Sequence, residues 1–343
     1  MAPNLASNLD RLGRMKAIVI PQYGGPEVLT VREMPEPPEV PGELLVRVQA
    51  AGVNFADIMS AAGGYLGTPP PPLIAGREFC GELPGTSARV MGYTQWGAFA
   101  EAVSARKGYF WPAPAHWSAQ EGAAFPVNYF TAYLAYWKAG LAGLQTEDHQ
   151  PDKSPSPRRP RVLIHAVAGG VGTAAVQIGR LLGIETYGTS SSEEKLTRVK
   201  PLGLDHGINY RERDYEEAIR DLTGGEGVDA VFEMLGGEHT QKSVKCLREF
   251  GSVIVYGAAT GKPGTLDPRV LYAKGASVHG LWLSVLSSNQ PVMESAWARL
   301  SAWITADQLR PVVGHVFPME QASEAFQLLL ARQNFGKVVF TIP

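Results

Sequence analysis

The sequence predicts an α/β protein in which a mostly-β region precedes a doubly wound parallel sheet. Residues 16–105 contain runs rich in β-branched side chains between Gly and Pro clusters, as in a β domain. From residue 128, strand-like runs alternate with amphipathic helices, which is typical of a parallel sheet with helices on both faces. A glycine cluster at 169–172 joins a strand to a helix. The 343 residues leave room for about two domains of roughly 150 residues each.

Composition excludes several classes of protein. Hydrophobic residues make up 45% of the chain and charged residues 19%, so it can build ordinary cores. A formal charge of −2 offers no overall field for nucleic acid or an anionic membrane. Two cysteines are too few for a disulfide framework or a zinc site built from thiolates. No run approaches about 20 apolar residues, so we expect no membrane span.

The first residues, 1–14, lack the apolar core of a signal peptide and are interpreted as an N-terminal extension. With few cysteines and no export signal, we expect a reducing cytoplasm as the location. The segment 145–160 is dense in Pro and charge and is predicted to be an exposed loop. Its arginines are interpreted as solvated loop charges rather than as a phosphate site.

In the first region, 16–20 and 43–53 are predicted strands, and no helix of any length is expected before Trp117. In the second region the predicted strands are 161–166, 184–189, 206–210, 228–234 and 251–259. The predicted helices between and after them are 169–183, 190–203, 213–222 and 239–249. The tail is predicted to form helices over 292–305 and 320–332 and a last strand over 337–342.

The most informative stretch is RVLIHAVAGGVGTAAVQIGRLLG, beginning at residue 161. A tight turn between strand and helix presents backbone N–H groups and the positive end of the helix dipole to a pyrophosphate. Gly169 and Gly172 take the second and third positions of a G-x-G-x-x-G motif, whereas Val167 replaces the first glycine. The sequence therefore predicts a dinucleotide-binding turn formed by Ala168, Gly169, Gly170, Val171 and Gly172.

The end of the second strand indicates which dinucleotide binds. An acidic residue about 20 positions into such a unit grips the adenosine ribose of NAD. Here the strand ends with the hydroxyls of Thr189, Ser190 and Ser191, which leave room for a 2′-phosphate. Lys195 begins the next helix and Tyr210 ends the third strand, within predicted reach of that phosphate. The pattern therefore favours NADPH over NADH.

These residues resemble a known family, the zinc-free quinone oxidoreductases of the medium-chain dehydrogenase/reductase superfamily. The resemblance, closest to the zeta-crystallin and vesicle-amine-transport branches, is carried by GVNFADIM, GGY, IAGREFCGE, VNYFTAYLA, AVAGGVGTAAVQIG, GTSSSEEK, INY, VIVYG and NFGKVV. It implies a GroES-like, mostly-β catalytic domain formed by 15–127 and 289–343 around a Rossmann domain at 128–288. It also implies a cleft between them as the active site, and a homodimer. The apolar segment 272–288 is predicted to be a strand, either one that pairs with a second copy or an internal strand of the sheet.

The resemblance also indicates how this chain departs from the zinc enzymes. Zinc members carry Cys-Gly-x-Asp and Gly-His-Glu at the metal, whereas this chain has Asn54 and Arg77 in place of the thiolate and imidazole ligands. The seven histidines are scattered, and Cys80 is expected to be a small buried residue. We therefore expect no metal.

From the same resemblance we expect Asn54 and Tyr65 to donate hydrogen bonds to the substrate carbonyl, with Tyr65 as the proton source. Asp57 is expected to hold the local network, or simply to cap a turn. Thr131 would position the nicotinamide ribose or amide. The family segments ending at Gly257 and beginning at Asn334 are expected to complete the cofactor site.

The sequence thus predicts a metal-independent, NADPH-dependent oxidoreductase that reduces quinones or α,β-unsaturated carbonyls by hydride transfer, because such acceptors are electrophilic without a Lewis acid. Two alternatives stay open: an enoyl-thioester reductase, and an NADPH-binding interaction protein with little turnover. Ala61, where the family often has Arg, and the short segment 83–90 are departures that bear on substrate choice.

Overall fold

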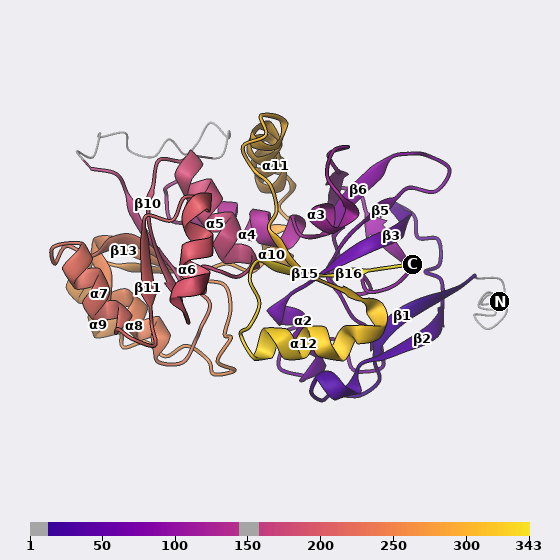
Figure 1. Ribbon diagram of the computed structural model, residues 1–343, viewed down its shortest axis with the longest axis horizontal. Coiled ribbons are helices and arrows are strands. Elements are labelled where there is room, and N and C mark those ends of the chain that lie inside the picture. The colour runs from indigo at the N-terminus through magenta and orange to yellow at the C-terminus, as the bar shows by residue number, and fades with distance from the viewer. Residues whose placement is uncertain (1–12, 144–157) are drawn as a thin grey trace. The chain divides into compact units, whose positions relative to one another are not determined.

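The computed structural model describes residues 13–143 and 158–343, and its contacts divide the chain into two units. The first unit contains 13–127 and 311–343, and the second contains 128–310 (Figure 1). The predicted second boundary, 288/289, is corrected to 310/311. Helix α11 (Gln290–Thr305) belongs to the second unit because Phe130 stacks on Trp297 and Tyr133 meets Trp303 edge to face. The predictions for 1–12 and 145–157 lie outside the described residues.

The first unit is mostly β. Its larger sheet has the strand order β15-β16-β3-β5-β6-β8, with β7 paired to β3. These strands are β3 (Glu43–Val53), β5 (Glu78–Glu82), β6 (Arg89–Tyr93), β7 (Ala102–Arg106), β8 (Phe110–Pro112), β15 (Val313–Pro318) and β16 (Lys337–Thr341). A smaller sheet consists of β1 (Arg14–Ile20), β2 (Thr30–Pro35) and β4 (Leu73–Ile74). Because β1 already begins at Arg14, the predicted extension is one residue too long.

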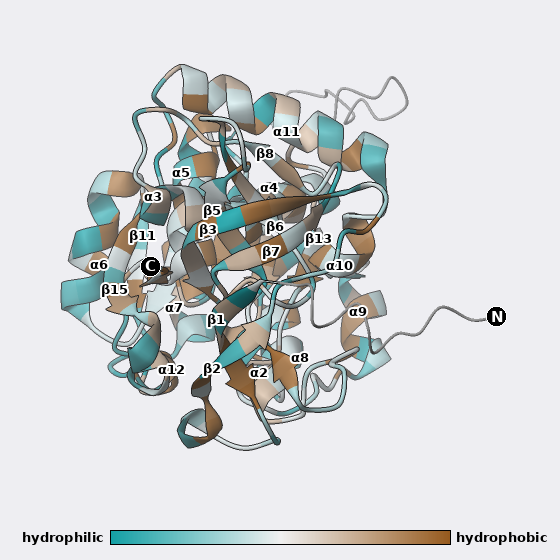
Figure 2. Cartoon of the chain, turned by 90° about the vertical axis from the view of Figure 1, so that its right-hand side faces the viewer, coloured by the Kyte–Doolittle hydropathy of each residue, from teal (hydrophilic) through white to brown (hydrophobic). Residues whose placement is uncertain are grey.

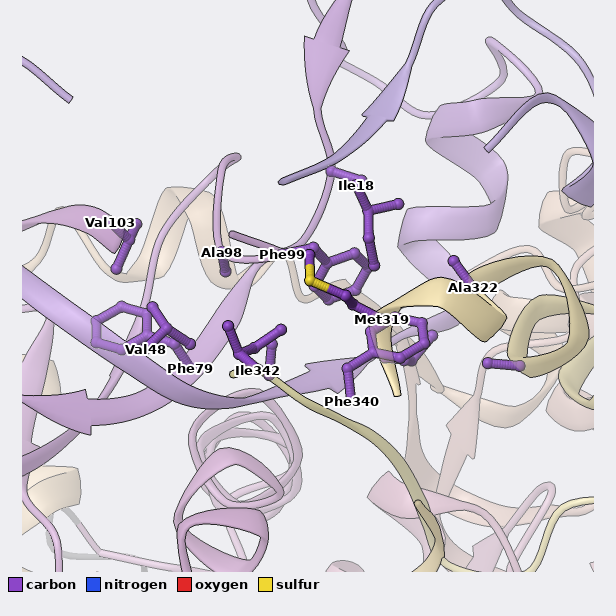
Figure 3. Close-up of a cluster of buried hydrophobic side chains, with 14 of the residues drawn as sticks. Ile18, Val48, Phe79, Ala98, Phe99, Val103, Met319, Ala322, Phe340 and Ile342 are labelled. Atoms are coloured by element: carbon purple, nitrogen blue, oxygen red, sulfur yellow. The ribbon is translucent and has the colours of Figure 1, made fainter. Parts of the chain in front are cut away.

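The C-terminal strand completes the N-terminal sheet, since β16 pairs antiparallel with β3. The core beneath it joins residues that are far apart in the sequence, and Figure 3 shows Ile18, Phe99, Met319 and Phe340 pointing toward one another. The rings of Phe99 and Phe340 meet edge to face with centroids 4.9 Å apart. The short helices of this unit are η1 (Pro26–Val28), α2 (Phe55–Ala61), α3 (Ala119–Ala123), η3 (Met319–Gln321) and α12 (Ala322–Leu330).

The second unit is a six-stranded parallel sheet with the order β11-β10-β9-β12-β13-β14, which confirms the doubly wound fold. Its strands are β9 (Arg161–Ile164), β10 (Glu185–Ser190), β11 (His206–Asn209), β12 (Val228–Glu233), β13 (Leu247–Val255) and β14 (Ser277–Gly280). Its helices besides α11 are α4 (Pro126–Lys138, which begins at the boundary), α5 (Gly170–Leu181), α6 (Glu193–Val199), η2 (Lys200–Leu202), α7 (Tyr215–Leu222), α8 (His239–Lys245), α9 (Pro268–Lys274) and α10 (Leu283–Leu286).

The helices follow the amphipathic pattern that predicted them. Figure 2 shows alternating apolar and polar bands along α11, whose buried residues are Val292, Met293, Ala296, Leu300 and Ile304. Within the described ranges, no helix is long and apolar enough to cross a membrane.

Three element predictions are wrong. The short helix α2 was not predicted, because seven residues are too few to show a helical period. The predicted helix 239–249 ends at Lys245, since the strand β13 already begins at Leu247. The predicted apolar strand 272–288 contains only the four-residue strand β14, flanked by the end of α9 and by α10.

Candidate active site and cofactor-binding turn

The first candidate site is built at the start of α2. Asn54 precedes the helix, and its backbone N–H donates to the Asp57 carboxylate at 2.8 Å, a reciprocal cap that the N-x-x-D spacing allows. Asp57 is only 1% exposed, so a cation must balance its charge. Asp57 therefore caps the first turn of α2, and its carboxylate also belongs to a local network of buried charges.

That cation is Arg77, which is 3% exposed. Its Nη1 donates to Asp57 Oδ1 at 2.6 Å, and its Nη2 donates to Ser60 Oγ at 2.9 Å. The guanidinium carbon lies 4.3 Å from the ring centroid of Tyr65 and 4.2 Å from that of Trp96. Desolvated cation–π contacts of this kind contribute about 2 kcal/mol or more each. Sequence reasoning noted Arg77 only as a missing ligand and did not find these contacts.

A second buried ion pair adjoins the first. Lys337 forms a salt bridge with Glu78, and both are at most 3% exposed. Lys337 Nζ also donates to Asn54 Oδ1 at 2.7 Å, and Asn54 Nδ2 donates to Glu78 Oε1 at 2.9 Å. Because an ammonium only donates and a carboxylate only accepts, these partners fix the orientation of the Asn54 amide. Its remaining N–H points to the carbonyl of Gly52 at 3.3 Å.

This geometry changes the expected role of Asn54. Both amide hydrogens are engaged within the first unit, so Asn54 has none left for the substrate carbonyl predicted from the sequence. The amide instead links the ends of β3, β5 and β16. Glu78 and Lys337, which sequence reasoning did not single out, belong to this network. The only sequence signal for these two residues was that they lie in segments that resemble the family, IAGREFCGE and NFGKVV.

Tyr65 lies in a glycine-rich turn after α2. Gly63 and Gly67 have φ of 76° and 74°, a left-handed conformation that favours glycine. The Tyr65 carbonyl accepts hydrogen bonds from the backbone N–H and hydroxyl of Thr68. The Tyr65 side chain is half-buried, and the neighbouring Leu66 is 75% exposed. The turn thus presents the aromatic ring of Tyr65 beside Arg77.

The second candidate site is the turn between β9 and α5. Ala166 adopts a left-handed φ of 50°, and its carbonyl accepts from the Gly169 N–H at 2.9 Å. A Cβ at Gly172 would lie 2.5 Å from the carbonyl oxygens of Ala166 and Val167, so only glycine fits there. Val167 takes the place of the first motif glycine because its side chain packs against Gly188, where a Cβ would lie 2.6 Å away.

The N-terminus of α5 fits a pyrophosphate. Its N-cap is Gly169, which has no side chain to accept from the first-turn N–H groups. The helix has 12 residues, so its dipole adds to these donors. Ala168 is buried, while Gly170 and Val171 are half-buried at the turn. The predicted turn residues are thus contiguous and suited to an anionic dinucleotide.

The hydroxyls at the end of β10 differ from one another. Thr189 is 2% exposed, and its Oγ1 lies 3.1 Å from His165 Nδ1, so it belongs to a buried hydrogen-bonded pair. Burial, with smaller contributions from His239 and Lys242, lowers the pKa of His165 to about 3. The expected contact of Thr189 with a phosphate stays a prediction, and His165 is the partner that the structure shows for its hydroxyl.

The remaining predicted phosphate ligands lie together. The Tyr210 N–H donates to the carbonyl of Ser190, and both Ser191 and Lys195 are half-buried. Burial lowers the pKa of the Lys195 ammonium. Glu194 opposes this shift, whereas Arg211 and Arg198 lower the pKa further. Arg211, the residue after Tyr210, was missed by the sequence analysis.

Three predicted cofactor residues lie elsewhere. Thr131 is buried on α4, one turn after Asn128, whose amide lies against Gly170. Gly257 follows β13 and faces the Met234 carbonyl. Asn334 belongs to the first unit, where its amide donates to the carbonyl of Gly336 at 3.2 Å.

Comparisons with known proteins decide the family. Residues 40–93 match the alcohol dehydrogenase GroES-like domain, and residues 170–302 match the zinc-binding dehydrogenase model. The chain is 30% identical to the quinone oxidoreductase of Lama guanicoe, with 96% of this chain and 98% of the relative covered. It belongs to the zinc-free quinone oxidoreductase-like family of medium-chain dehydrogenases/reductases.

The chain is also similar to other known proteins. The human synaptic vesicle membrane protein VAT-1 homolog is 30% identical, with 95% of this chain and 86% of the relative covered. The quinone oxidoreductase from Thermus thermophilus, whose structures include a complex with NADPH, is 36% identical with a TM-score of 0.82, covering 95% and 100% of the two chains. The CurK enoyl reductase is 25% identical with a TM-score of 0.81, covering 96% and 100%.

At the positions where zinc members of the superfamily carry metal ligands, this chain has other residues. Arg77, in place of the histidine ligand, carries a guanidinium that has no lone pair for a metal. Burial raises the pKa of the nearby Cys80 thiol to about 12, which keeps it neutral. Across the described ranges no group of three or more His, Cys, Asp or Glu residues is arranged to hold a metal ion.

Proposed function

We propose that this protein is a metal-independent, NADPH-dependent oxidoreductase that reduces quinones or α,β-unsaturated carbonyls. The observation that carries the proposal is the end of β10, where Thr189 and Ser190 stand in place of the acid that grips the ribose of NAD, beside the glycine turn of α5. Such an arrangement suits a dinucleotide with a 2′-phosphate. The NADPH complex of the related Thermus thermophilus enzyme supports the same cofactor. Arg77 in place of a metal ligand favours acceptors that are already electrophilic.

When bound, NADPH supplies a hydride from nicotinamide C4 to a carbon of the acceptor. The residues of the chain hold the reactants. The first-turn N–H groups of α5 bind the pyrophosphate, and Lys195 with Arg211 holds the 2′-phosphate. Tyr65 donates a hydrogen bond to the acceptor carbonyl and gives its proton to that oxygen as negative charge develops there. Water then restores the proton to Tyr65.

A panel of acceptors tests the proposal. NADPH oxidation is followed with 9,10-phenanthrenequinone, a simple enone and a crotonyl thioester, and we expect turnover with the quinone or the enone. NADPH should bind more tightly than NADH, as measured by quenching of tryptophan fluorescence. If NADPH binds but no acceptor oxidises it, the proposed activity is wrong.

The role of Tyr65 has its own test. Tyr65→Phe should lower kcat by about 100-fold and leave the Kd for NADPH unchanged, because a general acid typically contributes at least that factor. Tyr109→Phe is the matched control, since Tyr109 also lies beside an arginine, Arg106, in the same unit. Full activity of Tyr65→Phe would remove Tyr65 from the mechanism.

Enoyl-thioester reduction is the second candidate, supported by the likeness to the CurK enoyl reductase. Preference for the crotonyl thioester over the other acceptors would favour it. The likeness to the VAT-1 homolog supports the third hypothesis, an NADPH-binding interaction protein with little turnover. Binding of NADPH without oxidation by any acceptor would favour that hypothesis.

The proposal includes a homodimer in a reducing cytoplasm. Among the described strands β14 is one of the two edge strands of its sheet, and its Val278 is partly exposed, so this edge is suited to pairing with a second copy. Light scattering that gives the mass of a single chain would contradict this part.

A further inference from the structure

Arg77 makes contacts that a buried ion pair does not require. Its charge is already balanced by Asp57, yet Nη2 also holds Ser60, and two aromatic rings lie within 4.3 Å of the guanidinium carbon. Asp57 and Ser60 both lie on α2, so the guanidinium is anchored to a helix through two of its nitrogens. Its plane is therefore fixed, and a fixed plane orients the rings that stack on it.

The turn that carries Tyr65 needs such an orienting contact. Glycines in the left-handed conformation stand two residues before and two residues after Tyr65. The backbone between them is held at Thr68, which donates to the Tyr65 carbonyl and to Ser60 Oγ. These bonds fix the main chain, and the guanidinium of Arg77 contacts the Tyr65 ring itself.

We propose that Arg77 is a positioning residue that fixes the Tyr65 ring on its guanidinium, so that the Tyr65 hydroxyl is preorganised for the acceptor carbonyl. The inference rests on the proposed role of Tyr65 and deepens it. A cation thus replaces a metal ligand at this position and acts through an aromatic neighbour rather than on the substrate. Trp96, half-buried on the same guanidinium, completes the aromatic surface offered to a flat acceptor.

Fluorine NMR of protein labelled with 3-fluorotyrosine tests the positioning directly, without reference to activity. The Tyr65 resonance is assigned as the one absent from Tyr65→Phe. In Arg77→Met it should shift and broaden as the ring gains freedom. Arg77→Lys, which keeps a charge for Asp57 but not the planar fork, should give an intermediate result. Arg106→Met, which removes the matched contact on Tyr109, should leave the Tyr65 resonance in place.

Because Arg77→Met leaves the buried Asp57 unpaired, the double variant Arg77→Met/Asp57→Asn is measured as well. The neutral amide can still accept from the Asn54 N–H, so this variant keeps the cap of α2. If either of these variants folds and its Tyr65 resonance is unchanged, the inference is wrong.

Kinetics connect the position of the ring to turnover. Removing Arg77 should lower kcat with 9,10-phenanthrenequinone by about tenfold to 100-fold while the Kd for NADPH stays unchanged, because misplacement by about 1 Å costs that much. In the Tyr65→Phe background the same change should cost less than about threefold, since Arg77 acts through Tyr65. Equal losses in both backgrounds would contradict the inference. The Tyr65 resonance could shift in Arg77→Met while Tyr65→Phe keeps full activity. In that case the proposed role of Tyr65 is wrong, but the positioning of its ring by Arg77 stands.

Discussion

The two candidate sites differ in how completely their polar groups are paired within the chain. In the first unit, Asp57 is paired with Arg77 and Glu78 with Lys337, and all four residues are at most 3% exposed. In the second unit, the N-cap of α5 is Gly169, which supplies no side-chain cap. The charges of the first site are paired within the chain, whereas the first turn of α5 offers backbone N–H groups to a ligand.

The difference reflects what each site must do. A site that orients a proton donor has to hold it in one direction, so its own charges must be satisfied by neighbours. A site that binds a nucleotide needs donors that its own chain does not use. Substitutions in the first site should therefore act mainly on stability and turnover, and substitutions in the second mainly on affinity for the cofactor. The substitutions that follow test this contrast in order of expected size.

The largest effect is expected for Glu78→Gln. It leaves Lys337 buried without its counter-charge, and breaking such a pair costs about 3–5 kcal/mol. Urea unfolding followed by circular dichroism measures the change. The control is Glu36→Gln, whose partner Arg47 is well exposed, and it should cost no more than about 1 kcal/mol. Similar losses in both variants would mean that the first site is not a closed network.

Gly172→Val should raise the Kd for NADPH by about 100-fold or more, a loss of roughly 2.7 kcal/mol. A Cβ here would meet the carbonyl oxygens of Ala166 and Val167, so the turn must open and its N–H groups move away from the pyrophosphate. Fluorescence titration gives the Kd. Gly280→Ala is the control, because its Cβ would meet nothing within 4 Å. If Gly172→Val folds and binds NADPH as tightly as the wild type, this turn does not bind the cofactor.

His165 shows that the second unit also contains closed pairs, and it predicts a dependence of stability on pH. Its pKa is about 3 in the folded protein against an ordinary value of 6.5, so between these limits only the unfolded chain takes up the proton. Stability from this group is complete above pH 6.5 and falls by about 1.4 kcal/mol per pH unit toward pH 3.

Urea unfolding at about pH 6.5, 5.5 and 4.5 measures this fall. His165→Gln should remove the loss of stability at low pH that comes from His165, while replacing the exposed His116 with Gln should not. If the wild type and His165→Gln have the same pH dependence, His165 does not stay neutral in the fold.

The smallest effect is expected for Lys195→Ala. Loss of one cation near the 2′-phosphate should raise the Kd for NADPH by about fivefold to tenfold and leave the Kd for NADH unchanged, since NADH lacks that phosphate. Lys200→Ala, on the exposed end of the same helical segment, is the control. An equal loss of affinity for both cofactors would indicate that Lys195 acts on helix stability instead.

Much of the fold could be predicted because its signals are local. The strand–glycine–helix pattern at 161–183 needs only neighbouring residues, and the parallel sheet followed from the repeated alternation of strands and helices. The short helix α2 and the end of α8 were missed because short elements depend on caps and on the strand that follows. The second domain boundary was misplaced because the packing of Trp297 and Trp303 on α4 leaves no local pattern.

The sequence by itself determined the fold class, the glycine turn and the absence of metal-ligand residue types at Asn54 and Arg77, since these depend on residue type and spacing along the chain. Only the tertiary structure decided the partner of each polar group. Lys337 meets Asn54 across 283 positions of sequence, Arg77 lies against Tyr65 and Trp96, and Thr189 pairs with His165. A buried charge or hydroxyl must be satisfied by whatever the fold brings near it, and that neighbour is set by packing rather than by spacing.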